Sequence, residues 1–537
     1  MSGPAVTHAD LVAEALAAEG VDRCYGLPGG EVVALIEACR RREIEFHLIG
    51  HEASAAFMAG TEGRIMGRPG VCIGTLGPGA MNLVTGVAGA FLDREPLLAF
   101  TASLATAADS GYTHQRLALA ELFGPITKRS IILEGHDTGH AVRAAAALAR
   151  AQRPGPVHLA LPSDVARMEV PGGLGPEPAR EEQEPPNLPE TLEQAADLIA
   201  GAARPLVVVG LGVDPRRAGP ALGAFIDAGR FPWVTTPKIK GILSEEHPRW
   251  MGIAGGMAAD AQVRDLLNDA DLLIAVGFDP VESDSEWFVG RRVVAIDSVD
   301  VARGGYQPVL QVTGNPSEIL SWLGRRVGAA VGWEPDHLQR RKTAVRGALA
   351  PRAGPGGLSP SEVIAALRRA FPQDGILTCD VGAHKLLLGQ LWTTYEPLTF
   401  FMSNGLSSMG YGLPAAAAAQ ICFPQRSVCC VTGDGGMLMT GHMLEYLRRQ
   451  RLPVVTVVLT DNSLSLIRLA QERRGYPTAG VEFTAPAFAA MAQAFGVEGR
   501  RVSTLGELSR AFAAALDARE PWLLDVPIDG REYADQM

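Results

Sequence analysis

The feature that most constrains this chain is the alternation of short apolar runs with longer helical patterns along most of its 537 residues. Residues 205–209, 271–276, 428–432 and 453–459 are the clearest runs, and each is apolar almost throughout. Continuous apolar runs of this length are typical of strands that are buried on both faces of a parallel sheet, with helices as the crossover connections. The sequence therefore predicts an α/β protein whose parallel sheets are flanked by helices.

Two stretches rich in proline and glycine interrupt this alternation. Residues 171–189 read PGGLGPEPAREEQEPPNLP, and residues 351–360 read PRAGPGGLSP. Segments of this composition bury too little apolar surface to form a core, so we interpret both as linkers. They divide the chain into three predicted domains of ordinary size, at 1–170, 190–345 and 356–537.

Composition excludes several classes of protein. The chain is 47% hydrophobic and 20% charged, as is usual for soluble globular proteins. No run approaches the roughly 18–20 apolar residues of a membrane helix, and the opening residues do not resemble a signal peptide, so we expect a cytoplasmic protein. The net charge of -11 comes without a basic patch, which argues against nucleic-acid partners. The seven cysteines show no zinc or disulfide spacing, which favours a reducing compartment.

The most informative motif follows the apolar run at 428–432, where residues 433–436 read Gly-Asp-Gly-Gly. Glycines let a backbone approach a phosphate closely, and a carboxylate is a hard oxygen ligand for Mg²⁺. The next apolar run ends at Asp461-Asn462. Parallel strands end at one edge of their sheet, so Asp434 and Asp461 could share a magnesium ion that holds a diphosphate. Gly-Asp-Gly alone is more often a turn, and only the full order of strand, motif, helix, strand and Asp-Asn favours the site.

This order resembles the diphosphate–magnesium motif of thiamine-diphosphate-dependent enzymes. The resemblance implies a glutamate early in the chain that hydrogen-bonds the aminopyrimidine ring of the cofactor, and His51-Glu52 matches it. Residues 25–30 look like the loop that closes over the pyrimidine. Residues 75–82 are similar to a Ser-Gly-Pro-Gly loop of the family, with Leu76 in place of the serine. The cofactors implied are thiamine diphosphate and Mg²⁺.

Two further segments extend the resemblance. In residues 403–410, Met409 matches the bulky apolar residue that bends the cofactor, and in residues 379–384, His384 matches a histidine that touches its diphosphate. The resemblance implies metal ligands at Asp434, Asp461 and Ser463. It implies cofactor contacts from Pro28, Gly29, Asn82, Gly382, Ala383, His384, Asn404, Leu406, Met409, Gly433, Gly435 and Gly436.

Within this group the chain looks most like acetolactate synthases. Residues 113–115 and 122–128 resemble their substrate-side segment, so the catalytic residues implied are Glu52, Gln115 and Lys128. Residues 276–282 are similar to the catabolic, flavin-independent branch, so no FAD is expected. The glycines after 205–209 and 271–276 are only a weak signal for a dinucleotide in the middle domain. The family builds each site from two subunits, which implies a homodimer at minimum and favours a homotetramer.

The function implied is decarboxylation of a 2-oxo acid, with pyruvate as the first choice, and carboligation of the acyl unit to a second 2-oxo acid. Departures from the family pattern at Leu76, Leu466 and Ala470 keep open a carboligase of specialised metabolism with a different donor or acceptor. A simple 2-oxo acid decarboxylase is the closest rival, although the adjacent histidine pair that many of these enzymes use is missing among the 11 histidines. A non-catalytic relative that only binds the cofactor is the third alternative.

Overall fold

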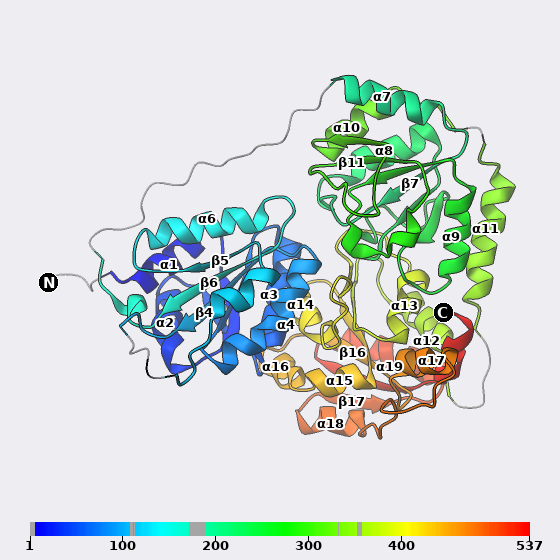
Figure 1. The fold of residues 1–537 in the computed structure, drawn as a ribbon. Helices are drawn as coiled ribbons and strands as arrows, with labels where there is room; N and C mark the ends of the chain where they lie inside the picture. The colour runs from blue at the N-terminus through cyan, green and yellow to red at the C-terminus, as the bar shows by residue number, and fades with distance from the viewer. Residues whose placement is uncertain (1–5, 108–110, 112, 171–188, 331, 352–356) are drawn as a thin grey trace. The chain divides into compact units, whose positions relative to one another are not determined.

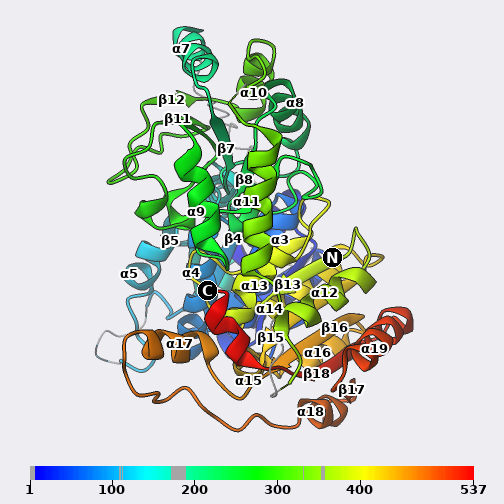
Figure 2. The same ribbon diagram turned by 90° about the vertical axis from the view of Figure 1, so that its right-hand side faces the viewer.

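The computed structural model describes residues 6–107, 111, 113–170, 189–330, 332–351 and 357–537. It contains three domains, each with a six-stranded parallel sheet flanked by helices (Figure 1, Figure 2), which confirms the predicted fold class. Of the two predicted linkers, residues 171–188 and 352–356 lie outside the described residues. Among the residues that are described, no helix combines the length and the apolar character needed to cross a membrane.

The N-terminal sheet has the strand order β2-β1-β3-β4-β6-β5. Strands β3, β4 and β6 are buried along almost their whole length, as their continuous apolar sequences predict. Helices α3 and α4 pack closely because Gly86 has no side chain: a Cβ there would lie 2.4 Å from the Cβ of Ala56. The elements are α1 (His8–Ala18), β1 (Arg23–Leu27), α2 (Val33–Arg41), β2 (Glu45–Leu48), α3 (Glu52–Met66), β3 (Gly70–Gly74), α4 (Pro78–Leu92), β4 (Leu97–Ser103), α5 (Leu119–Phe123), β5 (Arg129–Ile132), α6 (Thr138–Arg150) and β6 (Pro156–Pro162).

The middle sheet has the order β12-β11-β10-β7-β8-β9, so its order reverses between β7 and β10. Both of these central strands are fully buried. The elements are α7 (Pro189–Ala200), β7 (Pro205–Val209), α8 (Gly219–Gly229), β8 (Trp233–Thr235), β9 (Trp250–Ile253), α9 (Asp260–Asp269), β10 (Leu272–Val276), β11 (Val293–Asp297), β12 (Leu310–Thr313), α10 (Pro316–Gly324) and α11 (Pro335–Ala348). Short 3₁₀ turns η4 (Pro237–Ile239) and η5 (Pro280–Glu282) follow β8 and β10.

The C-terminal sheet has the order β14-β13-β15-β16-β18-β17, which repeats the topology of the N-terminal sheet strand for strand. The elements are α12 (Pro360–Ala370), β13 (Ile376–Cys379), α13 (Ala383–Leu391), β14 (Phe400–Met402), α14 (Gly412–Cys422), β15 (Val428–Gly433), α15 (Asp434–Thr440), α16 (Met443–Arg449), β16 (Val454–Thr460), α17 (Ser465–Arg473), α18 (Phe488–Ala494), β17 (Glu498–Arg501), α19 (Leu505–Ala518) and β18 (Trp522–Pro527).

One segment of the C-terminal third belongs, by its contacts, with the N-terminal domain. Residues 405–424, which include α14, form a compact unit with that domain, and the middle domain forms a second unit with the remainder of the C-terminal third. The contact is made on α3: Thr61 Oγ1 donates to the hydroxyl of Tyr411, and the Phe57 ring meets the Tyr411 ring edge-on. Helix α14 is buried along most of its length because its sequence is a run of small residues.

Within the second unit, a fully buried ion pair of the middle domain also contacts the C-terminal part of the chain. The ammonium of Lys240 lies 2.8 and 2.9 Å from the two carboxylate oxygens of Glu245, and both side chains have no exposed surface. Glu245 also accepts a hydrogen bond from the backbone of Thr394. The Lys240 ammonium also lies over the rings of Trp250 and Phe400. Neither charge reaches solvent, so the pair is sensitive to loss of either partner.

We therefore expect Lys240→Met to destabilise the protein by about 3–5 kcal/mol, because the variant leaves the buried carboxylate of Glu245 without its cation. The change is measured as a drop in Tm. Arg40→Met is the matched control, because Arg40 and Glu37 form an exposed ion pair on α2. The control should shift Tm far less, and equal losses in the two variants would contradict this reasoning.

Candidate active site

The first group of predicted residues lies where the order of the N-terminal sheet reverses, between β1 and β3. Pro28 and Gly29 follow β1, and residues 75–77 follow β3. The two loops touch: a Cβ on Gly29 would lie 2.3 Å from Oγ1 of Thr75, so this approach requires glycine. In open α/β sheets, ligands bind at the carboxyl ends of the strands where the order reverses. The structure therefore brings this pair of loops to the expected position for a ligand.

Glu52 is the first residue of α3, which begins shortly after β2. His51 caps the helix, its ring Nδ1 accepting a hydrogen bond from the Ala53 amide. The Glu52 side chain is 3% exposed, and Asn82 Nδ2 donates to its Oε2 at 2.9 Å. Its other oxygen faces Gly79, where a Cβ would lie 3.1 Å away. Two predicted residues, Glu52 and Asn82, thus meet, and the other carboxylate oxygen of Glu52 faces Gly79 in the first turn of α4.

Gln115 reaches the same loop region from a distant part of the sequence. Gly77, the N-cap of α4, has a φ of 65°, and a Cβ there would lie 3.0–3.2 Å from the side chain of Gln115. Gln115 is exposed and itself has a φ of 54°. The structure therefore places the predicted substrate-side glutamine at the start of the helix that carries Asn82.

Lys128 is engaged elsewhere in the domain. Its ammonium donates to the carbonyl oxygens of Leu148 and Ala151 at 2.7 and 2.6 Å, so it caps the C-terminal end of α6. Burial lowers the pKa of Lys128 to about 8. These contacts are structural ones, and the catalytic role of Lys128 stays a prediction.

Leu406 and Met409 precede α14, in the segment that packs with the N-terminal domain. The Leu406 side chain lies 3.9 Å from the position of a Cβ at Gly89 on α4. Met409 is half-buried, and its carbonyl accepts a hydrogen bond from the Ser408 hydroxyl. A half-buried methionine has an exposed part that can contact a ligand, and its role as a wedge against the cofactor stays a prediction.

The second group of predicted residues lies at the carboxyl edge of the C-terminal sheet. Asp434 follows β15 directly and Asp461 follows β16 directly. Oδ2 of Asp434 accepts hydrogen bonds from the amides of Asn462 at 2.7 Å and of Asp461 at 3.2 Å, while its Oδ1 accepts from the Gly435 amide at 2.8 Å. The structure therefore brings the two predicted acidic residues together, as the parallel pairing of β15 and β16 requires.

The electrostatics of these acids fit a divalent cation. Burial and the neighbouring Asp461 raise the pKa of Asp434 to about 6, and burial also raises the pKa of Asp461. The hydroxyl oxygen of Ser463 is buried without a hydrogen-bond partner. In the part of the chain that the structure describes, no three His, Cys, Asp or Glu side chains gather as a metal cluster. Mg²⁺ is typically held by one or two carboxylates together with phosphate oxygens and water, so this donor set suits it.

Beside the acids, a set of glycines leaves space around His384. A Cβ on Gly433 would lie 3.2 Å from the His384 ring, and one on Gly382 would lie 2.8 Å from its Nδ1. The ring is buried, its Nε2 has no partner, and burial lowers the pKa of His384 to about 4. A neutral imidazole beside an open backbone can donate one hydrogen bond to a phosphate. The remaining predicted residues here are Ala383, at the start of α13, and Gly435 and Gly436, at the start of α15.

Asp380 and Lys385 are residues of this edge that the sequence reasoning missed. Thr432 Oγ1 donates to Oδ2 of Asp380 at 3.1 Å, and a Cβ on Gly436 would lie 2.1 Å from the same oxygen. Lys385 is buried, and its ammonium lies 3.3 Å from Oδ1 of Asn404, another predicted cofactor contact. Asp380 follows β13 directly, so the rule that identified Asp434 and Asp461 could have found it.

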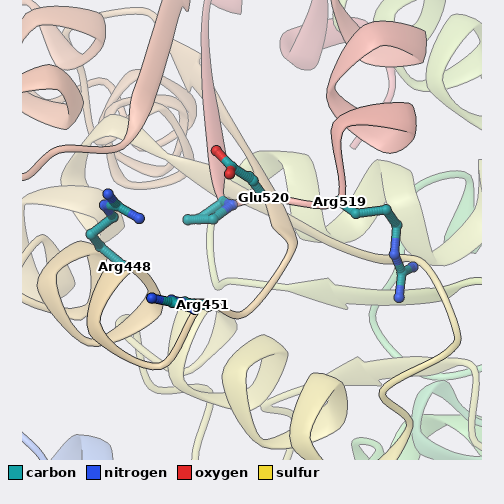
Figure 3. A pocket seen from close by; sticks show the side chains of 5 residues that line it. Arg448, Arg451, Arg519 and Glu520 are labelled. Carbon is teal, nitrogen blue, oxygen red and sulfur yellow. The ribbon is translucent and has the colours of Figure 1, made fainter.

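A cavity of about 290 Å³ lies at the opposite edge of this sheet (Figure 3). The residues that line it come directly before β16 and β18 in the sequence, whereas Asp434 and Asp461 come directly after β15 and β16. None of the predicted site residues lines it. The residues that do are Arg448, Arg451, Arg519, Glu520 and Pro521.

The raised pKa of Asp434 predicts a pH-dependent stability for the metal-free protein. Its pKa rises from 3.8 to about 6 on folding, so the folded state binds more protons between these values and stability falls as the pH rises through them. Asp434→Asn removes this penalty. In EDTA, the advantage of the variant in free energy of unfolding should therefore grow from pH 4 to pH 7, to at most about 3 kcal/mol, and appear as a growing difference in Tm. Asp374→Asn, at an exposed position, is the control, and a difference that does not change with pH would contradict the assignment.

Comparison with known proteins agrees with this geometry. Models of the thiamine pyrophosphate enzymes match three stretches: the N-terminal TPP binding domain at residues 6–122, the central domain at 192–323 and the C-terminal TPP binding domain at 380–526. Thiamine pyrophosphate is another name for thiamine diphosphate. Each match falls on one of the three sheets.

The similarity to known proteins extends over nearly the whole chain. The large subunit of acetolactate synthase isozyme 2 from Escherichia coli is 31% identical over 98% of this chain and 96% of its own length. The acetolactate synthase of Bacillus subtilis is 29% identical, covering 98% and 94%. A catabolic acetolactate synthase from Raoultella terrigena is 28% identical, covering 98% and 95%. These matches confirm the resemblance noted in the sequence, and the chain belongs to the acetolactate synthase family of thiamine-diphosphate-dependent enzymes.

Proposed function

We propose that this enzyme decarboxylates a 2-oxo acid, pyruvate first, and joins the acyl unit to a second 2-oxo acid, with thiamine diphosphate and Mg²⁺ as its cofactors. The observation that carries the proposal is the buried carboxylate of Glu52, held through one oxygen by Asn82 at the point where the N-terminal sheet reverses its order. A buried carboxylate with one oxygen left for a ligand is suited to hold a proton on a heterocyclic nitrogen.

When bound, thiamine diphosphate supplies a nucleophilic carbon and an electron sink for decarboxylation. The work of the protein is to hold the ring through Glu52, to shape it with Met409 and to bind the diphosphate at the edge of the C-terminal sheet. There, the buried imidazole of His384 donates a hydrogen bond while Asp434 and Asp461 hold the metal ion with Ser463. The unpartnered Nε2 of His384 and the raised pKa of both acids support this assignment. No flavin has a role in this proposal.

Gln115 is the proposed substrate-side residue, because it lies against Gly77 at the N-terminus of α4. Its amide can donate to a carboxylate or a carbonyl oxygen of a 2-oxo acid. The departure from the family at Leu76 carries no weight against pyruvate, since that side chain is 4% exposed and packs in the hydrophobic core of the domain. Leu466 and Ala470 lie half-buried on α17 and are the positions through which the acceptor could differ.

We propose further that the enzyme is at least a homodimer, with each site completed by a second copy, and that it assembles as a tetramer in the cytoplasm. Exposed apolar side chains lie beside both groups of site residues: Met81 next to Asn82 on α4, and Leu438 and Met439 on α15 after Asp434. Contiguous exposed apolar patches mark protein interfaces, and the proposal expects a second copy to cover these side chains. The cysteines all carry free thiols, which fits a reducing compartment.

Replacing Glu52 by Gln should lower kcat at least about 100-fold, because an amide cannot take up or hold the proton as a carboxylate does. The assay incubates the protein with thiamine diphosphate, Mg²⁺ and pyruvate and identifies products by mass. Wild type should form acetolactate, and acetaldehyde as the main product would favour the simple decarboxylase. Glu43→Gln, at an exposed turn, is the control. Full activity of Glu52→Gln, with unchanged Tm, would refute the proposed mechanism.

Mixing two inactive variants tests whether two copies form each site. Glu52→Gln and Asp434→Ala are each expected to be inactive, but a heterodimer pairs the intact Glu52 of one copy with the intact Asp434 of the other. After denaturation and refolding together in equal amounts, about a quarter of the wild-type activity should return. If both residues served one site within a single chain, the mixture would stay inactive.

A further inference from the structure

The carboxyl edge of the middle sheet has the geometry of a nucleotide site and yet is closed by the chain itself. The sheet order reverses between β7 and β10, where dinucleotide-binding folds hold their anionic ligand. Here the loops after these strands are in direct contact. The Gly212 amide donates to the Gly277 carbonyl at 2.7 Å, and a Cβ on Gly210 would lie 2.7 Å from the same oxygen.

The carboxylate of Glu282 lies against the loop after β7 and is 4% exposed: a Cβ on Gly210 would lie 3.1 Å from its Oε2. Its Oε2 accepts a hydrogen bond from the Leu211 amide at 2.7 Å, and its Oε1 accepts one from the Thr236 hydroxyl at 2.6 Å. A backbone amide after the first strand is the donor that would otherwise hold a phosphate oxygen. The donors after β7 and β8 therefore already hold an anion, which the loop after β10 supplies.

The same edge of the middle domain holds residues 402–404 of the C-terminal domain. The Lys238 ammonium, buried on η4, donates to the Met402 carbonyl at 2.9 Å. Asn404 Nδ2 donates to the backbone carbonyl of Glu282 at 3.3 Å, while Asn404 Oδ1 accepts from Lys385 at 3.3 Å. Both ends of the Asn404 amide are thus held, one end by the middle domain.

We infer that Glu282 is a positioning residue for cofactor binding, which acts through Asn404. Its carboxylate fixes the loop after β10 to the ends of β7 and β8, and the carbonyl of the same residue then orients the side chain of Asn404. This inference rests on the proposed function, in which Asn404 contacts the cofactor. This edge of the middle sheet serves to align that residue and does not take a nucleotide.

Loss of the carboxylate would leave the Leu211 amide and the Thr236 hydroxyl buried without their acceptor, so the loop after β10 would relax. A displacement of about 1 Å at a binding group can change function about 100-fold. Glu282→Ala should therefore weaken thiamine diphosphate binding by about tenfold or more and increase hydrogen exchange in the peptide that spans residues 400–410. Glu282→Gln keeps one acceptor oxygen, so its Kd for thiamine diphosphate should lie between those of Glu282→Ala and wild type.

The experiment compares Glu282→Ala, Glu282→Gln, Asn404→Ala and the double variant Glu282→Ala/Asn404→Ala. The control is Glu286→Gln, whose carboxylate lies four residues further on and forms an exposed pair with Arg264. Titration of each protein with thiamine diphosphate in the presence of Mg²⁺ and without substrate gives Kd, and kcat and KM for pyruvate are measured separately. Glu282 and Asn404 act on one contact, so their effects on Kd should not add. The Kd of the double variant should equal that of whichever single variant binds the cofactor less tightly.

Wild-type affinity in Glu282→Ala, or additive losses in the double variant, would overturn the inference, as would saturable binding of an adenine dinucleotide to the wild type. If Glu282→Ala does not fold, unchanged Kd and unchanged exchange at 400–410 in Glu282→Gln would overturn it equally. Failure of the proposed function is a separate result, since the wild type itself would then fail to bind thiamine diphosphate or to convert pyruvate.

Discussion

Parallel pairing of strands is the constraint on which this structure depends. In each of the three sheets all strands run in one direction, so their carboxyl ends and the loops that follow them meet at one edge. This brings Asp434 and Asp461 together although 26 residues separate them in the sequence, because β15 and β16 are neighbours in register. It also brings the loops after β1 and β3 into contact. Burial of both faces by helices, in turn, keeps these edges the main places where the sheets can meet a ligand.

The two groups of site residues differ in their electrostatics. At the N-terminal sheet a single buried carboxylate, Glu52, is stabilised by a neutral amide, which leaves it able to hold a hydrogen bond with a ligand. At the C-terminal sheet, Asp434 is buried and Asp461 beside it is half-buried, and desolvation raises the pKa of each. Such a pair is costly in the ionised form unless a positive charge compensates it. The glycines beside His384 leave the backbone open on that side.

The middle domain has the strand order of a nucleotide-binding fold, but the residues at the carboxyl ends of its strands bond to other parts of this chain. Its strand order is that of dinucleotide-binding domains, yet the Glu282 carboxylate takes up the Leu211 amide after the first strand, and Lys238 donates to the Met402 carbonyl. The fully buried pair of Lys240 and Glu245 lies close by in sequence and bonds to Thr394 of the C-terminal region. Two contacts of buried charged side chains, Lys238 with Met402 and Glu245 with Thr394, thus join the middle domain to the C-terminal domain, where the diphosphate is proposed to bind.

The sequence by itself determined the fold class, the three domains and the acidic edge of the C-terminal sheet, because buried strands and the residues directly after them are local patterns. It also placed Glu52 at a helix start and, through its motifs, assigned the family. The tertiary structure alone decided that Asn82 holds Glu52, that Lys128 caps α6 and that Asn404 lies between Lys385 and Glu282. The grouping of residues 405–424 with the N-terminal domain was also decided there. The physical reason is that side-chain partners from distant segments depend on how the loops and helices pack, which no local pattern of residues encodes.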